Sequence, residues 1–206
     1  SLASTLASTL TCALAVTVLL TACASPAPPA RMYQLRAEPP GAVTPPAAGT
    51  AVAPSLQLLA MSLPELLERD AILVPQGRAG VQALAGHRWA EPLRDALPRV
   101  LRQDLARVLG VAQVWVAPVP AGVAVQQQLR LDVLSLQADE ARRAVTLQVR
   151  WTLIDSSGAL PALTRVETVS APVQGADVDA IAVAHRLALW RLAEALAVQI
   201  KSRASP

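Results

Sequence analysis

The clearest pattern in the sequence is a strict alternation of apolar and polar residues over positions 145–153, within an expected strand at 145–155. Bulky apolar residues occupy every second position, which is typical of a β-strand with one face in a core and the other in water. A similar stretch at 126–137 precedes it, and the polar segment 138–143 between them predicts a β-hairpin. Further strands are expected at residues 31–37, 55–61, 71–75, 111–118 and 164–171.

Two other segments repeat their apolar residues with the 3.6-residue period of an α-helix. The first covers about 88–109, where Pro92 suits the first turn and Gly110 suits the end. Pro98 lies inside this segment, so the helix is expected either to bend there or to begin later. The second helix is expected at about 178–201.

His185 and the charged side chains of the first helix are expected to face water, whereas His87 is interpreted as a loop or helix-entry residue. His185 lies off the apolar stripe of the second helix. His87 ends a segment with three glycines, 76–87, which is interpreted as a loop. Charged residues of both signs on the first helix are expected on its solvent-exposed face: Arg94, Asp95, Arg102, Asp104 and Arg107.

The order of these elements is three strands, a helix, four strands and a helix, with a short turn or helical piece at 63–69. This order predicts an α+β fold in which a mixed, largely antiparallel sheet packs against the two main helices. A single globular domain is expected over residues 31–203, with a Pro-rich loop at 38–54.

The N-terminal 30 residues carry no charge, and an apolar run of 13 residues occupies positions 10–22. That run is too short for a membrane-spanning helix, which needs about 20 apolar residues, but it fits a secretory signal peptide. It ends in Leu-Thr-Ala-Cys at 20–23, which resembles the bacterial lipobox. Residues 1–22 are therefore expected to be a lipoprotein signal peptide, and 23–30 a lipidated cysteine with a Pro-rich tether.

Cys23 is the expected lipidation site, because its thiol can be thioether-linked to diacylglycerol. The alternatives are an ordinary thiol after a signal peptide and a cysteine in a buried helix. Two or three acyl chains anchor a protein firmly, since each buried methylene contributes about 0.8 kcal/mol. Ala24 stands where an Asp commonly retains lipoproteins at the inner membrane, so the outer membrane is favoured.

Composition and motifs weaken other classes of function. The net charge is only +3 and aromatic residues make up 2% of the chain, which argues against a nucleic-acid partner. Two His and two Cys fit no zinc-ligand spacing. The sequence contains none of the common nucleophile, phosphate-loop or metalloprotease motifs. We therefore expect no enzyme, no catalytic or metal-ligating residues, and no cofactor besides the covalent lipid on Cys23.

Several segments together resemble the PqiC/YmbA-like family of ABC-type transport auxiliary lipoproteins. The lipobox is followed closely by Tyr-Gln-Leu at 33–35. The segment Leu-Pro-Glu-Leu-Leu-Glu-Arg at 63–69 resembles the family's Leu-Pro-x-x-Leu-x-Arg. Arg-Trp-Ala-Glu-Pro-Leu at 88–93 resembles its most recognisable stretch, at the start of a helix. Trp89, Glu91 and Pro92 in that stretch are interpreted as structural or as a partner surface.

The resemblance implies a non-enzymatic lipoprotein, carrying palmitate or similar acyl chains, on the periplasmic face of the outer membrane. Its partners would be an MCE-domain protein and inner-membrane transporter components of an intermembrane lipid transport system. The resemblance also allows a homo-oligomer. Two alternatives stay open: a periplasmic lipid-binding carrier, and a periplasmic hydrolase using His87 or His185.

Overall fold

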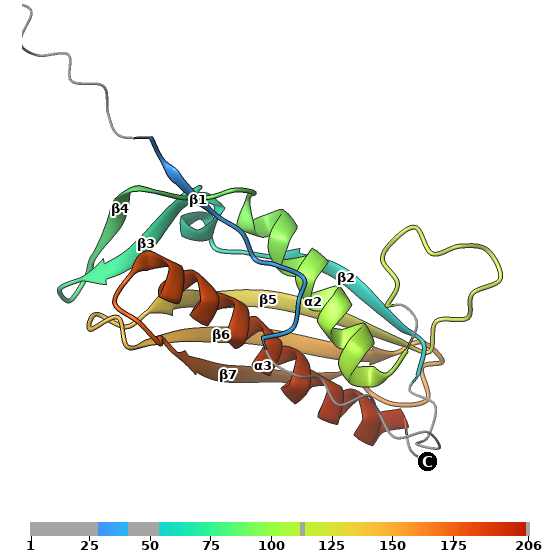
Figure 1. Ribbon diagram of the computed structural model, residues 1–206. Coiled ribbons are helices and arrows are strands. Elements are labelled where there is room, and N and C mark those ends of the chain that lie inside the picture. Colours follow the sequence, from blue (N-terminus) through green and yellow to red (C-terminus); the bar gives the residue numbers. More distant parts are fainter. Residues whose placement is uncertain (1–28, 41–53, 112–113, 205–206) are drawn as a thin grey trace, which may run out of the picture. The chain divides into compact units, whose positions relative to one another are not determined.

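The computed structural model describes residues 29–40, 54–111 and 114–204 (Figure 1). Cys23 and the expected signal peptide lie outside the described residues, as does most of the loop expected at 38–54. The chain forms two units, Ser1–Ala30 and Arg31–Pro206.

In the described part of the chain, seven strands form two sheets. The three-stranded sheet has the order β1-β4-β3, and the four-stranded sheet has the order β2-β5-β6-β7. The pairs β1–β4 and β2–β5 are parallel, whereas the other three pairs are antiparallel. The α+β class is confirmed, and its strands divide between two sheets. The strands are β1 (Arg31–Tyr33), β2 (Leu56–Ser62), β3 (Ala71–Gln76), β4 (Gly80–Trp89), β5 (Gln127–Ala138), β6 (Ala144–Asp155) and β7 (Leu163–Pro172).

The hairpin of β5 and β6 is the centre of the larger sheet, as its alternation predicts. The turn between them includes Arg142 with a positive φ of 55°. The apolar positions of β6 are each at most 1% exposed, so this face is fully in the core. They are Val145, Leu147, Val149, Trp151 and Leu153. Past β6, Asp155 accepts hydrogen bonds from Ser157 and from the N–H of Ala159, which lowers its pKa and fixes the expected turn.

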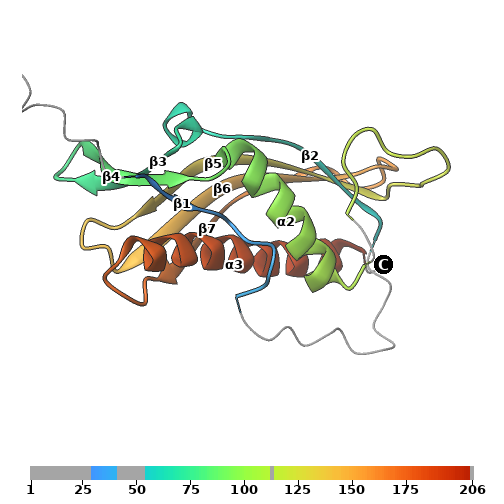
Figure 2. The same cartoon turned by 45° about the horizontal axis from the view of Figure 1, so that its top comes forward.

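Two helices, α2 (Leu93–Leu109) and α3 (Val178–Ala204), cover one face of the four-stranded sheet (Figures 1 and 2). A single 3₁₀ turn, η2 (Glu65–Glu68), fills the short piece expected between β2 and β3. None of the helices in the described part of the chain is long and apolar enough to cross a membrane.

Helix α2 begins after Pro92 and continues through Pro98, so it starts a few residues later than the expected position 88. It ends as its sequence predicts. Gly110 has the left-handed φ of 72° that favours glycine, and the N–H of Val111 donates to the carbonyl of Ala106 at 3.0 Å.

Two of the expected elements are wrong. The segment 76–87, interpreted as a loop, contains most of β4, whose residues are largely exposed, so it shows no apolar alternation. The segment 111–118, expected as a strand, forms no named strand in its described residues and pairs with β2 through an isolated bridge between Trp115 and Gln57. Pro118 and Pro120 have no N–H to donate, so this pairing cannot extend toward the C-terminus.

Candidate functional site

The segment 31–40, which we call the strap, crosses both helices after leaving the small sheet (Figure 1). Only its first three residues form a strand, although the sequence predicts one to position 37. Leu35 is completely buried. The carbonyls of Leu35, Arg36 and Ala37 accept hydrogen bonds from arginine side chains.

Three arginines bind the carbonyls of three consecutive strap residues. From α2, Arg99 donates to the carbonyl of Leu35 at 3.4 Å, and Arg107 donates to that of Ala37. From α3, the Nε–H of Arg186 donates to the carbonyl of Arg36 at 2.7 Å. The strap is therefore fixed to both helices by side chains that lie far away in the sequence.

Arg186 also forms a buried ion pair with Asp104, which joins α2 to α3. Both guanidinium NH₂ groups donate to the carboxylate at 2.7 Å. Asp104 is 0% exposed and Arg186 is 6% exposed. Burial raises the pKa of the Asp104 carboxyl, while the two bonds from Arg186 oppose that rise. The expectation that Asp104 faces water is wrong, because this pairing satisfies its charge in the core.

The segment 88–93 forms the junction of the small sheet with α2. Trp89 ends β4, is 4% exposed, and packs edge-on against the ring of His185, with ring centroids 5.3 Å apart. Glu91 forms an ion pair with Arg99, the arginine that also binds the strap. Pro92 is the N-cap residue of α2. These contacts support a structural role for Trp89, Glu91 and Pro92.

His185 was expected at the surface and is instead 5% exposed. Its Nδ1 lies 2.8 Å from the carbonyl oxygen of Ile181, four residues earlier on α3. Burial lowers the pKa of His185 to about 4, although the bond to Ile181 favours the charged form. The sequence missed this burial because α3 packs against the sheet, against α2 and beneath the strap.

We expect His185 to make the protein less stable in acid. In the unfolded chain its pKa is 6.5, so as pH falls below that value the unfolded state takes up the proton first. Between pH 8 and pH 5 this group should lower the free energy of unfolding by about 2 kcal/mol. Urea unfolding at both pH values measures this. The decrease in the free energy of unfolding from pH 8 to pH 5 should be about 2 kcal/mol larger in the wild type than in His185→Gln. Equal dependence in the two proteins would contradict this prediction.

His87 lies on β4 rather than in a loop. Its Nδ1 is 2.8 Å from the hydroxyl of Tyr33, and the two rings stack with centroids 5.6 Å apart. In the described part of the chain, no three His, Cys, Asp or Glu residues are grouped so that they could hold a metal ion. The two histidines lie on different elements, β4 and α3. His87 contacts Tyr33, and His185 contacts Ile181 and Trp89.

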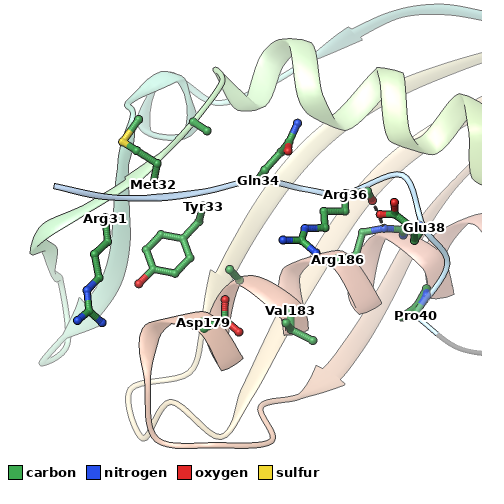
Figure 3. Close-up of a pocket in the computed structure, with 12 residues that line it drawn as sticks. Arg31, Met32, Tyr33, Gln34, Arg36, Glu38, Pro40, Asp179, Val183 and Arg186 are labelled. Carbon is green, nitrogen blue, oxygen red and sulfur yellow. Dashed lines mark hydrogen bonds between the residues drawn. The ribbon is translucent and has the colours of Figure 1, made fainter.

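A groove of about 1050 Å³ lies between the strap and α3. Arg31 is at one end and Pro40 at the other, while Tyr33 and Arg36 point into it from the strap (Figure 3). Asp179 and Val183 point into it from α3. Sequence reasoning could not find this groove, because its two walls are about 150 positions apart in the chain.

The fold and this site define a two-sheet α+β domain whose N-terminal strap is bound to both helices, with a surface groove between the strap and α3. The chain belongs to the family described as the ABC-type transport auxiliary lipoprotein component, whose sequence model matches residues 33–197. The match begins in β1 and ends within α3. Members of this family are described as auxiliary lipoproteins of ABC-type transport.

Solved structures share the fold. A crystal structure of a Xanthomonas campestris protein, assigned to DUF330, is 23% identical, with a TM-score of 0.67 over 85% of this chain and 99% of that one. A second, described as an uncharacterized protein, is 18% identical, with a TM-score of 0.66 over 84% and 99%. No match was found among curated proteins.

Proposed function

We propose that this protein is a non-enzymatic auxiliary component of an MCE-type intermembrane lipid transport system. It is held to the periplasmic face of the outer membrane by a covalent lipid on Cys23, and it needs no other cofactor. The observation that carries the proposal is the family match over residues 33–197, together with the lipobox at 20–23.

The protein would act by docking its partner at a fixed distance from the membrane. Arg31 follows Cys23 by eight positions, so the chain between them spans at most about 29 Å. From Leu35 to Ala37 the strap is bound to both helices by arginines. A force on the lipid anchor would therefore be transmitted to α2 and α3. The domain could then hold a bound partner close to the membrane.

The partners would be an MCE-domain protein and inner-membrane transporter components. Strand β7 is the last strand of its sheet, so one of its edges is unpaired among the described strands. An edge of this kind can accept a further strand from another chain. A second copy of the protein, or the MCE-domain partner, could use it in this way.

The described structure gives less support to a lipid carrier. The apolar pocket lined by Leu66, Val81 and Leu136, among others, has a volume of about 160 Å³. Pockets that enclose small-molecule ligands usually have about 300–1,000 Å³. This pocket is therefore too small to hold a whole acyl chain.

Cross-linking in the native envelope tests the proposed partnership. The full-length protein, carrying a C-terminal affinity tag, would be cross-linked in intact cells and purified under denaturing conditions. We expect an MCE-domain protein among the cross-linked species. An equally abundant outer-membrane lipoprotein of another family, with the same tag, is the control and should not recover it. Equal recovery by both, or by neither, would contradict the proposal.

A further inference from the structure

The groove between the strap and α3 contains charges of both signs that no described residue neutralises. Arg31, Arg36 and Glu38 come from the strap, and Asp179 comes from α3. All four are exposed, and none belongs to the ion pairs formed among the described residues. Two cations and two anions make the groove electrically balanced.

Arg186 also lines the groove, but its charge is already used. Its guanidinium binds both carboxylate oxygens of Asp104, and its Nε–H binds the strap. The charge of Arg186 is therefore neutralised by Asp104. The other charged side chains that line the groove are not paired with a described residue. Arg36 and Asp179 approach the same space from opposite walls (Figure 3).

Apolar side chains complete the lining of the groove. On the α3 wall, Val183 is 55% exposed and lies one helical turn after Asp179 (Figure 3). The volume of about 1050 Å³ is slightly above the usual range for ligand sites, about 300–1,000 Å³. A matching ligand would carry a negative group, a positive group and a short apolar part.

We propose that this groove binds the headgroup of a zwitterionic phospholipid. The phosphate would lie at Arg36, whose guanidinium can donate paired hydrogen bonds, and the ammonium at Asp179 on the opposite wall (Figure 3). Val183 would contact the glycerol and the first methylenes. The inference rests on the proposed function in one respect: an anchor on Cys23 would keep the groove close to a bilayer.

Calorimetric titration of the full chain in maltoside micelles, whose headgroup is uncharged, tests this site. The probes are dihexanoyl phosphatidylethanolamine, dihexanoyl phosphatidylglycerol and inorganic phosphate. We expect the ethanolamine lipid to bind at least tenfold more tightly than the glycerol lipid, because only the former has an ammonium group. Inorganic phosphate should bind far more weakly than either lipid.

Two groove variants and two matched controls sharpen the test. Arg36→Gln should weaken both lipids at least tenfold, and Asp179→Asn should remove only the preference for ethanolamine. Arg94→Gln and Asp95→Asn, which remove the same charges from the exposed face of α2, should bind as the wild type does.

Any one of three results would overturn the proposed site. These are equal affinity for the two lipids, inorganic phosphate binding as tightly as the ethanolamine lipid, and wild-type affinity in both groove variants. Loss of the MCE-domain cross-link in Arg36→Gln, without any lipid binding by the wild type, would instead make the groove a protein-binding surface. The titration does not depend on acylation. A failed titration with an intact anchor therefore rejects the headgroup site and leaves the proposed function standing.

Discussion

Replacing Asp104 with alanine is expected to lower the free energy of unfolding by about 3–5 kcal/mol. The substitution leaves the Arg186 guanidinium buried at 6% exposure without its carboxylate. It also removes the bond that joins α2 to α3 beneath the strap. Urea denaturation of the wild type and of the variant measures the loss directly. If the variant does not fold, Asp104→Asn, which keeps the shape and one acceptor, provides the comparison.

Two further variants separate the ion pair from general damage to α2. Asp95→Ala removes a carboxylate whose side chain is 64% exposed and should cost less than about 1 kcal/mol. Asp104→Leu combined with Arg186→Met removes both buried charges and should recover most of the loss. A cost below about 1 kcal/mol for Asp104→Ala would contradict the assigned role of this pair.

Replacing Trp89 with alanine should also cost about 3–5 kcal/mol, because it removes a large side chain that is 4% exposed. The cavity would open between the end of β4 and His185 on α3. Trp89→Phe keeps an aromatic ring against His185 and should recover a large part of the loss. Urea denaturation again provides the measurement.

The same variant discriminates between the two interpretations of the segment 88–93. A structural role predicts that Trp89→Ala is less stable than the wild type. Its binding to the partner should then decrease only in proportion to the fraction of protein that is unfolded. A partner surface predicts normal stability with the MCE-domain cross-link lost. An unfolding free energy within about 1 kcal/mol of the wild type would therefore reject the structural role of Trp89.

The sequence predicted the elements whose signal is local. The hairpin of β5 and β6 has the required alternation, and α2 ends where Gly110 permits a left-handed conformation. Strand β4 was missed because both of its faces are largely exposed, so its residues show no period. A strand with few buried side chains leaves little trace in the pattern of apolar and polar residues.

The partners of the buried charges and the path of the strap could not be predicted, because the contacting residues are distant in the chain. Asp104 lies four residues after Val100 and seven after Leu97, on the apolar stripe of α2. That position was a usable signal, since a charge on a buried stripe needs a partner. Its partner is Arg186 on α3. The sequence could not identify this partner, because the pairing depends on how the two helices pack together.

The groove depends on the same long-range contacts. The strap reaches its position because arginines on α2 and α3 bind its carbonyls, and α3 then supplies the opposite wall. The sequence showed each segment separately, as a strand and as a helix. It did not show that the two would face each other across unpaired charges.

The most direct test of the central claim is the intact mass and membrane fractionation of the full-length protein and of Cys23→Ser, both expressed in a Gram-negative host. We predict that the wild type begins at Cys23, carries diacylglycerol mass and fractionates with the outer membrane, whereas the variant has no lipid and is released from it. A wild type without added lipid, or one found outside the envelope, would contradict the account.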